Sequence, residues 1–410
     1  MNKYKFIDIF AGCGGLEDGF LQTKKYVDVA AVEWLKPQVE TLRNRLKTKW
    51  KIHDSDSRVV YFDIQREKEL FHGWTDDPDY ASHPGLDSII NANGGIDLII
   101  GGPPCQAYSV AGRVRDENGM KNDYRNYLFE HYCSIVNRYK PKLFVFENVP
   151  GILSAKPDGT PITEHIRKGF LKIGYEIITD LSIAKVDASD YSVPQKRERV
   201  VIVGLSKSVF KDPQITLHFF YTTILPKYRA KKTITVKQAI GDLPKIMPYL
   251  DENHHKMHVA YKKPKCNVTW HEARYQNLRD IDTFRILAED LESGKCEYDS
   301  KKIAELYEQK IGSKSPIHRY HVLNPDKPST TIIAHLHKDG NRFIHYDSTQ
   351  SRSITVREAA RLQSFDDDFE FIGNRGNAYQ MIGNAVPPKL AEALGNAIYE
   401  LLEGIKNVSL

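Results

Sequence analysis

The sequence has few cysteines and no long run of apolar residues. Its 410 residues include five cysteines, and no two of them form a Cys-x-x-Cys pair: Cys13, Cys105, Cys133, Cys266 and Cys296. This usage argues against a disulfide framework and a zinc site, and it is typical of a reducing cytosol. No apolar run approaches the roughly 20 residues that span a bilayer, and the first residues lack a signal-peptide core. We therefore expect a cytoplasmic protein with no metal centre and no membrane segment.

The net charge is only +5, but it is uneven along the chain. Residues 206–325 hold 21 Lys and Arg against 14 Asp and Glu, a local net charge of +7, and the remainder is slightly acidic. Aromatic residues are interspersed in the same segment: Tyr221, Tyr228, Tyr261, Trp270 and Tyr275. Such a segment suits a polyanion such as nucleic acid, because contacts from Lys and Arg to phosphate dominate nucleic-acid affinity. A solvated lysine-rich face would have the same composition, so charge alone leaves both interpretations open.

Short apolar runs alternate with helix-like stretches over residues 1–205, without internal repeats or low-complexity tracts. The alternation predicts an α/β fold with a mostly parallel sheet flanked by helices. Expected helices cover residues 36–46 and 124–139. The expected strands are residues 5–10, 27–32, 59–62, 96–100, 143–147, 175–180 and 200–204.

From residue 206 the alternation ends, and one helix-like stretch stands out at residues 280–291. Order returns where Thr355 and Glu358 have the spacing of a capping box, and a final helix is expected at residues 389–402. We expect two domains, one formed by residues 1–205 with 376–410, and a smaller mixed domain of residues 206–375.

A glycine-rich turn follows the first expected strand, with Phe-Ala-Gly-Cys-Gly-Gly-Leu at residues 10–16. Such a turn lets the backbone approach a ligand and directs amide N–H groups at it. No Gly-Lys-Ser/Thr follows, and Glu17 occupies a position where the dinucleotide fingerprint has Gly or Ala. The turn therefore favours a ligand without a pyrophosphate.

Acidic residues end the next two expected strands. Glu33, with Trp34 beside it, ends the second, and Asp63 ends the third. A carboxylate at this position suits the hydroxyls of a ribose, an indole offers a flat face to a purine, and Asp63 adds an acceptor at the same edge. Together with the glycine turn, these residues predict an adenosyl site without a diphosphate.

Cys105 follows another expected strand, within Gly-Gly-Pro-Pro-Cys-Gln at residues 101–106. The two prolines fix two φ angles and remove two backbone donors, so we expect the thiol on a stiff, outward-turned loop. In parallel sheets, ligands bind beyond the carboxyl ends of the strands, where this thiol is expected. A lone cysteine is more often a buried apolar residue, and the surrounding sequence argues against that interpretation here.

A carboxylate and two guanidinium groups are expected near this thiol. Glu147 ends the buried strand at residues 143–147 and points to the same edge of the sheet. Alternation along the extended segment 195–199 places Gln195, Arg197 and Arg199 on one side.

Five motifs, in this order, resemble those of the cytosine-5 DNA methyltransferases that use S-adenosylmethionine. They are Phe-Ala-Gly-Cys-Gly-Gly-Leu (10–16), Pro-Pro-Cys-Gln (103–106), Glu-Asn-Val (147–149), Gln-Lys-Arg-Glu-Arg (195–199) and Gly-Asn-Ala-Val-Pro-Pro (383–388). Residues 357–365 resemble the element that precedes the last motif, and the resemblance covers roughly residues 4–205 and 316–400. The sequence departs from the family at Asp366, where members usually have proline, and at residues 71–93, a stretch longer than usual.

The resemblance implies a Rossmann-like S-adenosylmethionine-dependent core and a target-recognition domain at residues 206–375. Cys105 would add to carbon 6 of cytosine, because breaking the aromaticity makes carbon 5 nucleophilic. Glu147 would contact ring nitrogen 3, Arg199 the carbonyl oxygen of the base, and Arg197 the adjacent phosphate or the cysteine loop. The base must leave the duplex stack for this chemistry, and we expect residues 107–122 to close over it.

The resemblance also implies the remaining contacts and partners. The implied cofactor is S-adenosylmethionine, bound by Phe10, Gly12, Gly14, Glu33, Trp34, Asp63, Ile64, Pro104, Leu128, Asn384 and Val386. Contacts to duplex DNA are expected from Gln195, Arg274, Arg279 and Arg319. We further expect a monomeric bacterial restriction–modification methylase, cytoplasmic and associated with the nucleoid through DNA, with a cognate restriction endonuclease encoded separately.

Other classes of protein account for parts of the sequence. A tRNA cytosine-5 methyltransferase shares the Pro-Pro-Cys-Gln chemistry but would lack a large basic insertion such as residues 206–325, and it stays the main alternative. A nicotinamide-dependent oxidoreductase would explain the glycine turn but neither Cys105 nor the paired arginines. A catalytically silent DNA-binding relative is disfavoured because every expected catalytic residue is present.

Overall fold

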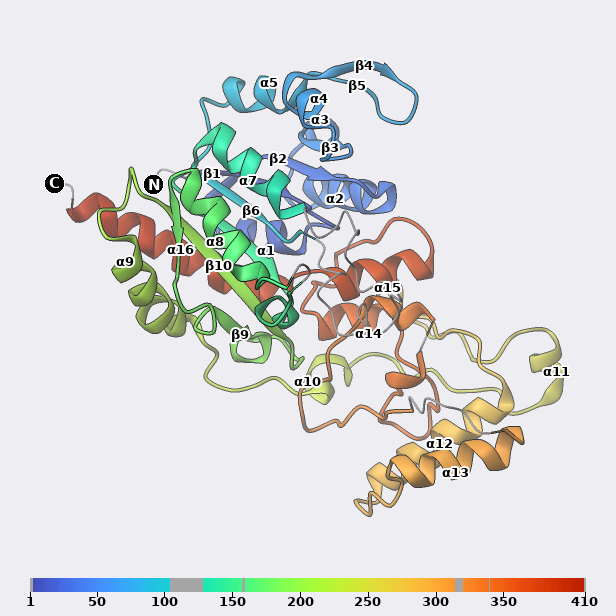
Figure 1. The fold of residues 1–410 in the computed structure, drawn as a ribbon. Coiled ribbons are helices and arrows are strands. Elements are labelled where there is room, and N and C mark those ends of the chain that lie inside the picture. Colours follow the sequence, from blue (N-terminus) through green and yellow to red (C-terminus); the bar gives the residue numbers. More distant parts are fainter. Residues whose placement is uncertain (1–2, 104–127, 157–158, 314–319, 339, 409–410) are drawn as a thin grey trace. The chain divides into compact units, whose positions relative to one another are not determined.

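The computed structural model describes residues 3–103, 128–156, 159–313, 320–338 and 340–408 (Figure 1). The chain forms two compact units. The first consists of Met1–Ser192, Arg197–Lys232 and Ala385–Leu410, and the second of Val193–Lys196 and Thr233–Asn384.

These units have other bounds than the domains expected from the sequence. Residues 206–232 count with the first unit because α9 (Pro213–Phe219) and the turns after it pack there. The Tyr221 hydroxyl, for example, donates to the carbonyl of Val201 and accepts from the N–H of Val203, each at 2.8 Å. Residues 376–384 count with the second unit, since α15 (Arg375–Asn384) packs on α14 (Val356–Leu362).

The first unit is built on an eight-stranded sheet with the order β3-β2-β1-β6-β7-β10-β8 and β9 paired to β10. In this sheet β3, β2, β1, β6 and β7 run parallel to one another, and β10 runs antiparallel to β7. All seven expected strands are present, which confirms the α/β class. The bounds are β1 (Tyr4–Ile9), β2 (Tyr26–Glu33), β3 (Val59–Tyr61), β6 (Leu98–Gly101), β7 (Leu143–Asn148), β8 (Tyr175–Ile177), β9 (Lys185–Asp187) and β10 (Glu198–Ser206).

The apolar sequence of the central strands reflects burial on both faces of the sheet. Leu98, Ile99 and Ile100 on β6 have no exposed surface, and neither do Leu143 and Phe144 on β7. A strand covered by helices on both sides loses the alternation of apolar and polar residues, which is why these segments are continuous hydrophobic runs. The helices of this unit are α1 (Gly15–Gln22), α2 (Lys36–Thr48), α3 (Ser55–Arg58), α4 (Glu67–His72), α5 (Gly85–Ala92), α7 (Leu128–Tyr139), α8 (Ile162–Lys172), α9 and α16 (Pro388–Val408).

Helix α16 returns to the first unit and packs on α1. The approach is close because two positions of α1 have no side chain. A Cβ at Gly15 would lie 2.4 Å from the carbonyl oxygen of Val386, and one at Gly19 would lie 2.4 Å from the Cβ of Ala391. The segment after residue 384 therefore completes the same layer as the N-terminal helix.

The long stretch at residues 71–93 contains a hairpin that the sequence did not predict. Strands β4 (Trp74–Asp77) and β5 (Ala81–His83) pair antiparallel in a sheet of their own. The Trp74 ring stacks on Phe62 with centroids 3.8 Å apart and on His83 at 5.0 Å. This stack attaches the hairpin to the residue that follows β3.

The second unit contains helices joined by extended segments with isolated bridges. The expected capping box is present, because Thr355 and Glu358 each bond to the other's backbone N–H. Buried Arg352 donates to both carboxylate oxygens of buried Glu358, each at 2.7 Å. The other helices are α10 (Val236–Ile240), α11 (Glu252–Lys256), α12 (Leu278–Glu292), which was expected at residues 280–291, and α13 (Ser300–Ile311), which was not.

Helices α12 and α13 lie side by side (Figure 1), and Phe284 and Leu287 of α12 share a small apolar core with Leu306 of α13. Over the described part of the chain, no helix combines the length and apolarity that a bilayer crossing requires.

Candidate active site

Glu147 and Arg199 form an ion pair at the carboxyl end of β7. The Nε of Arg199 lies 2.9 Å from Oε1 of Glu147, and the side chains are only 11% and 12% exposed. Glu147 is opposite Val201 in the antiparallel register of β7 and β10, so Arg199 is its diagonal neighbour on the same face. Burial lowers the pKa of Arg199, and the negative charge of Glu147 opposes this shift. The structure thus brings these two side chains together, and their roles at the base stay predictions.

Arg197 lies near this pair and is 1% exposed. Its Nη2 donates to the carbonyl of Ala385 at 3.1 Å, and its backbone N–H donates to Asp187 at 3.1 Å. Burial lowers its pKa well below the usual value, and the positive charge of Arg199 acts in the same direction. The charges of Arg197 and Arg199 therefore act on each other, and Arg197 itself lies just before β10.

Gln195 does not join them, which corrects its expected role as a DNA contact. It is fully buried and counts with the second unit. Its amide nitrogen donates to the carbonyl of Leu362 and to the side chain of Gln363, and its oxygen accepts from the N–H of Ile332 at 2.8 Å. The alternation argument failed here because β10 begins only at Glu198, and the chain passes into the other unit before it.

The strand exit that leads to Cys105 lies against Glu147. A Cβ on Gly102 would be 2.8 Å from Oε2 of Glu147, so glycine is what lets the carboxylate approach. The side-chain amide of Asn148 donates to the carbonyl of Pro103 at 3.4 Å. Pro104, Cys105 and the expected closing loop at residues 107–122 lie outside the described residues. Only Pro104 separates Pro103 from the expected nucleophile along the chain.

The glycine turn after β1 has three residues with positive φ: Phe10 at 62°, Gly12 at 58° and Gly14 at 87°. This backbone conformation is uncommon for a side chain such as that of Phe10, and such strain clusters at functional sites. A Cβ at Gly12 would meet nothing within 4 Å, so the turn leaves open space beside the backbone.

The carboxylate of Glu33 is held at the end of β2. One oxygen accepts from the N–H of Gly12 at 2.8 Å, and the other accepts from the N–H groups of Trp34 and Leu35 at 2.9 and 2.8 Å. Burial raises the pKa of Glu33, and these three N–H groups oppose the rise. A carboxylate has about four acceptor positions, so one position beyond these three bonds stays available to a hydroxyl.

The other expected cofactor residues of this edge lie close by. Trp34 is 49% exposed, Ile64 is buried, and Asp63 accepts from the N–H of Gln65. Val386 and Leu128 are buried within the first unit. Asn384 is exposed and belongs to the second unit.

The expected DNA contacts of the second unit differ in their surroundings. Arg274 is partly buried, and its Nη1 lies 3.4 Å from the carbonyl of His337. Arg279 is exposed, and within the described part of the chain its guanidinium has a 3.4 Å contact with Asp280. Arg319 lies outside the described residues.

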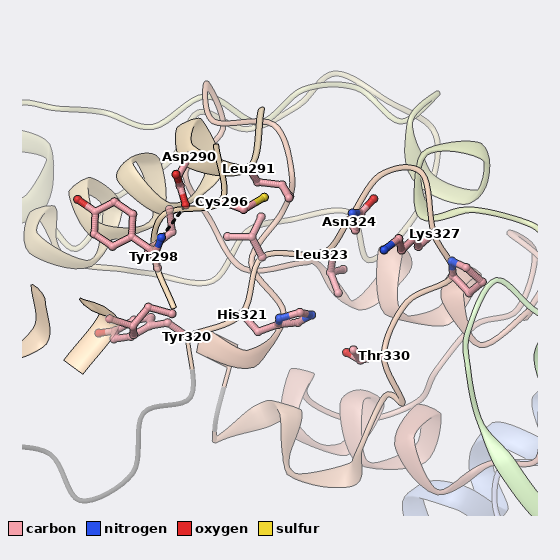
Figure 2. A pocket seen from close by; sticks show the side chains of 14 residues that line it. Asp290, Leu291, Cys296, Tyr298, Tyr320, His321, Leu323, Asn324, Lys327 and Thr330 are labelled. Carbon is pink, nitrogen blue, oxygen red and sulfur yellow. Dashed lines mark hydrogen bonds between the residues drawn. The ribbon is translucent and has the colours of Figure 1, made fainter. Parts of the chain in front are cut away.

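The second unit also has a cavity of about 370 Å³ between α12 and residues 320–330 (Figure 2). Apolar Leu287 and Leu323 line it together with polar groups such as His321 and Lys327. None of its lining residues is among the residues expected to contact the cofactor, the base or the DNA.

Two further residues at this edge were not predicted as site residues. Asn148 lies within the Glu-Asn-Val motif, so its place beside Glu147 was a usable signal. Tyr80 lies in the turn of the β4–β5 hairpin next to Tyr61 and Phe62. Its segment has no apolar alternation that would have predicted a strand pair there.

Comparisons with known proteins identify the family. Residues 4–400 match the family described as C-5 cytosine-specific DNA methylase. The chain is 31% identical to the type II methyltransferase M.Bpa9945I of Bacillus paralicheniformis, over 97% of this chain and 99% of that protein. It is 30% identical to the type II methyltransferase M.DdeI of Desulfomicrobium norvegicum, over 98% of this chain and 90% of that protein.

Solved structures agree with the fold. A prophage-encoded E. coli protein assigned as a DNA modification methyltransferase is 25% identical, with a TM-score of 0.58 over 98% of this chain and all of that one. The DNMT2 protein of Spodoptera frugiperda, at 14% identity and a TM-score of 0.51 over 97% of this chain and all of that one, shares the fold. The matched family uses S-adenosylmethionine as methyl donor and acts on DNA. With a match across nearly its whole length and a buried Glu147–Arg199 pair at the strand exit that leads to Cys105, the chain belongs to the C-5 cytosine-specific DNA methylases.

Proposed function

We propose that this DNA cytosine-5 methyltransferase uses Cys105 as nucleophile, Glu147 and Arg199 to hold the flipped cytosine, and Arg197 to support them. The observation that carries the assignment is the buried ion pair of Glu147 and Arg199 beside Gly102, three residues before the thiol. Addition of the thiolate to carbon 6 moves electron density into the ring and towards nitrogen 3. A carboxyl group at that nitrogen stabilises this charge by hydrogen bonding or by donating a proton.

Arg199 has a donor left for the base. Its Nε contacts Glu147 and its Nη1 donates to the carbonyl of Glu198 at 2.7 Å. The Nη2 group makes neither contact, and we assign it to the carbonyl oxygen of the cytosine. We also assign to the positive charge of Arg199 the stabilisation of the Cys105 thiolate, because a free thiol with a pKa near 8.5 needs such help at neutral pH.

S-Adenosylmethionine, when bound, supplies the methyl group. The residues at the carboxyl ends of β1 to β3 fit an adenosyl group: Gly12 leaves open space, Glu33 keeps an acceptor position for a ribose hydroxyl, and exposed Trp34 offers a face for adenine. Phe10, Gly14, Asp63, Ile64, Pro104, Leu128, Asn384 and Val386 complete the proposed cofactor set.

The substrate is duplex DNA with a specific target sequence, contacted by the exposed basic residues of the second unit, with Arg279 the clearest candidate. The names of the type II relatives support a role in a restriction–modification system with a separately encoded endonuclease. We propose a monomer that acts on chromosomal DNA in the cytoplasm.

A covalent trap tests the assignment. Bisulfite sequencing of DNA from expressing cells gives the target, and a duplex with 5-fluorocytosine at that position is then incubated with the protein and S-adenosylmethionine. Fluorine at carbon 5 blocks the final elimination, so we expect a denaturant-resistant adduct that Cys105→Ser abolishes. Cys296→Ser, which changes an exposed free thiol of the second unit, is the matched control and keeps the adduct. An adduct formed by the Cys105→Ser protein refutes the nucleophile assignment.

A further inference from the structure

Exposed apolar side chains gather on one segment of the second unit, residues 247–259. The two most exposed are Leu250 at 71% and Met257 at 64%, and the others on this segment are Met247 and Val259. In the described part of this unit two further large apolar side chains are exposed, and one of them, Tyr275, contacts the segment through the ring of His258. Single apolar residues on a surface are normal, but such a cluster indicates a binding surface.

The cluster lies on a two-stranded arm formed by residues 247–262. The backbone N–H of Tyr249 donates to the carbonyl of Ala260 at 2.8 Å, and the N–H of Lys262 donates to the carbonyl of Met247 at 2.9 Å. These bonds pair the two sides of the arm antiparallel, around an isolated bridge. Helix α11 lies at the tip of the arm (Figure 1).

The tip presents its apolar side chains on an ordered backbone. Leu250 lies just before the N-cap of α11, and Met257 directly follows the last residue of this helix. The Tyr249 ring stacks on His254 of α11 with centroids 3.7 Å apart, and Nε2 of His255 lies 2.8 Å from the carbonyl of Tyr249. Because the tip is already folded, little backbone entropy is lost when Leu250 and Met257 are buried by a partner.

The base of the arm is fixed to buried residues of the same unit. The Tyr261 hydroxyl lies 2.7 Å from Oε1 of Gln276 and 2.8 Å from the carbonyl of Ser351. Gln276 and Ser351 are both buried. The arm therefore projects from a fixed base and keeps its apolar tip away from the core of the unit.

Lysines flank this apolar tip. Residues 245–265 hold five lysines and two acidic residues, and the exposed lysines are Lys256, Lys262, Lys263 and Lys265. The ion pairs of Lys256 and Lys263 with glutamates are exposed to solvent, so they are weak and leave both lysines available to an anion. Interfaces between proteins are depleted of lysine, whereas phosphate attracts it. The charge of the arm therefore favours duplex DNA as the partner over another protein.

We infer that the arm is a DNA-bending wedge, in which Leu250 and Met257 enter between stacked base pairs and the lysines contact phosphates on either side. Proteins that bend DNA insert side chains such as leucine, methionine and proline in this way, and the partial unstacking kinks the duplex. The inference rests on the proposed DNA substrate and goes beyond it, because it assigns a deformation of the duplex to residues outside the proposed cofactor and base sites.

Energy transfer between dyes at the two ends of a short duplex measures the bend. The duplex carries the target sequence, and S-adenosylhomocysteine replaces the methyl donor so that no turnover occurs. We expect the wild type to bend the duplex by about 20–90°, and the protein with both Leu250→Ala and Met257→Ala to leave it nearly straight. This double variant should also bind the duplex about tenfold more weakly, because a buried leucine contributes about a factor of ten to binding.

Leu171→Ala is the matched control, since it truncates a half-exposed leucine on α8 of the first unit. It should keep the bend and the affinity of the wild type. The melting temperatures of all these proteins should stay close to that of the wild type, because exposed side chains contribute little to stability. A straight duplex in the wild-type complex, or a double variant that bends DNA as the wild type does, overturns the inference.

Sedimentation distinguishes DNA from a second copy of this chain as the occupant of the tip. If DNA is the occupant, the wild type and the double variant sediment alike when no DNA is present. A wild-type dimer that the double variant splits, with the bend unchanged, overturns the inference and assigns the tip to a contact between copies.

The adduct with 5-fluorocytosine distinguishes this failure from failure of the proposed function. If the wild type forms the adduct and the double variant still bends DNA, the methyltransferase chemistry stands and the role of the arm falls. If the wild type bends DNA through the arm but forms no adduct, the proposed nucleophile falls and the wedge stands.

Discussion

The Nε of Arg199 lies 2.9 Å from Oε1 of Glu147, and both side chains are nearly buried. Removing one member of such a pair leaves the other charge buried without a partner, which costs about 3–5 kcal/mol. The pair is therefore linked to stability as well as to the chemistry of the base.

Glu147→Gln keeps the shape of the side chain but removes its charge and its acidic proton. We expect kcat to fall by about 10²–10⁴, the range for a lost acid–base group, and the melting temperature to fall because Arg199 loses its counter-charge. Steady-state kinetics and thermal melts measure both. Lys185→Gln is the control: it disrupts the half-exposed ion pair of Lys185 with Glu198. It should alter the free energy of unfolding by no more than about 1 kcal/mol. A Glu147→Gln enzyme with wild-type kcat would exclude the proposed role.

Two glycines of the first turn should respond differently to alanine. At Gly12 a Cβ has open space but φ is +58°, so Gly12→Ala costs only about 1–2 kcal/mol of stability. The methyl group would occupy space assigned to the cofactor, and we expect affinity for S-adenosylhomocysteine to fall at least about tenfold, a loss of about 1.4 kcal/mol. At Gly15 the Cβ would lie 2.4 Å from the Val386 carbonyl, so Gly15→Ala should mainly lower the melting temperature. If Gly12→Ala and Gly15→Ala changed the affinity equally and the melting temperature equally, the open space beside Gly12 would not be the cofactor site.

Three buried acids of the first unit predict a pH-dependent stability. Asp8, Glu17 and Asp28 are at most 1% exposed, and among the described residues their carboxylate oxygens have no hydrogen-bond partner. Burial raises the pKa of Asp28 to about 7, although Arg58 opposes the rise, and burial also raises the pKa values of Asp8 and Glu17. The folded state thus keeps protons that the unfolded chain releases near pH 4.

Because the folded state binds more protons, the free energy of unfolding decreases as pH rises from about 4 to about 7. Asp28→Asn removes one of these titrations. We expect its melting temperature to exceed that of the wild type by a few degrees at pH 8 and to match it near pH 4.5, as scanning calorimetry can measure. If the melting temperature of the Asp28→Asn protein changed with pH as that of the wild type does, Asp28 would not be the source of this pH dependence.

Gln195 and Arg279 provide opposite outcomes in a DNA-binding assay. Arg279→Ala should weaken DNA binding. If Arg279 contacts a phosphate, the slope of log binding constant against log salt concentration should become shallower by about one. Gln195→Ala should leave the affinity of the folded protein for DNA unchanged and lower the melting temperature, because three hydrogen bonds in a buried position are lost. A loss of DNA affinity at unchanged stability in Gln195→Ala would restore its expected DNA contact.

The sequence predicted the parts of the fold whose signals are local. Continuous apolar runs such as that of β7 mark strands buried on both faces, and Thr355 with Glu358 shows its capping box directly. Helix α13 has comparable local signals, since Asp299 caps its N-terminus and Gly312 follows its C-terminus, although it was not among the predicted helices.

Other features depend on contacts between distant segments. The β4–β5 hairpin is attached through Phe62, which lies outside its own sequence, and the hairpin therefore escaped the fold prediction. Gln195 was misplaced because alternation describes a strand but not where the chain leaves one unit for another. The Glu147–Arg199 pair was predictable because both residues lie at strand ends that neighbour each other in the sheet.

The packing of α16 on α1 has a consequence for synthesis on the ribosome. Every residue of the second unit is translated before α16, yet α1 at the other end of the chain waits for α16 as its partner. The face of α1 that α16 covers, which includes Gly15 and Gly19, therefore stays uncovered through most of translation. A nascent chain arrested after residue 384 should be bound by chaperones through that face, and extending it past residue 408 should release it.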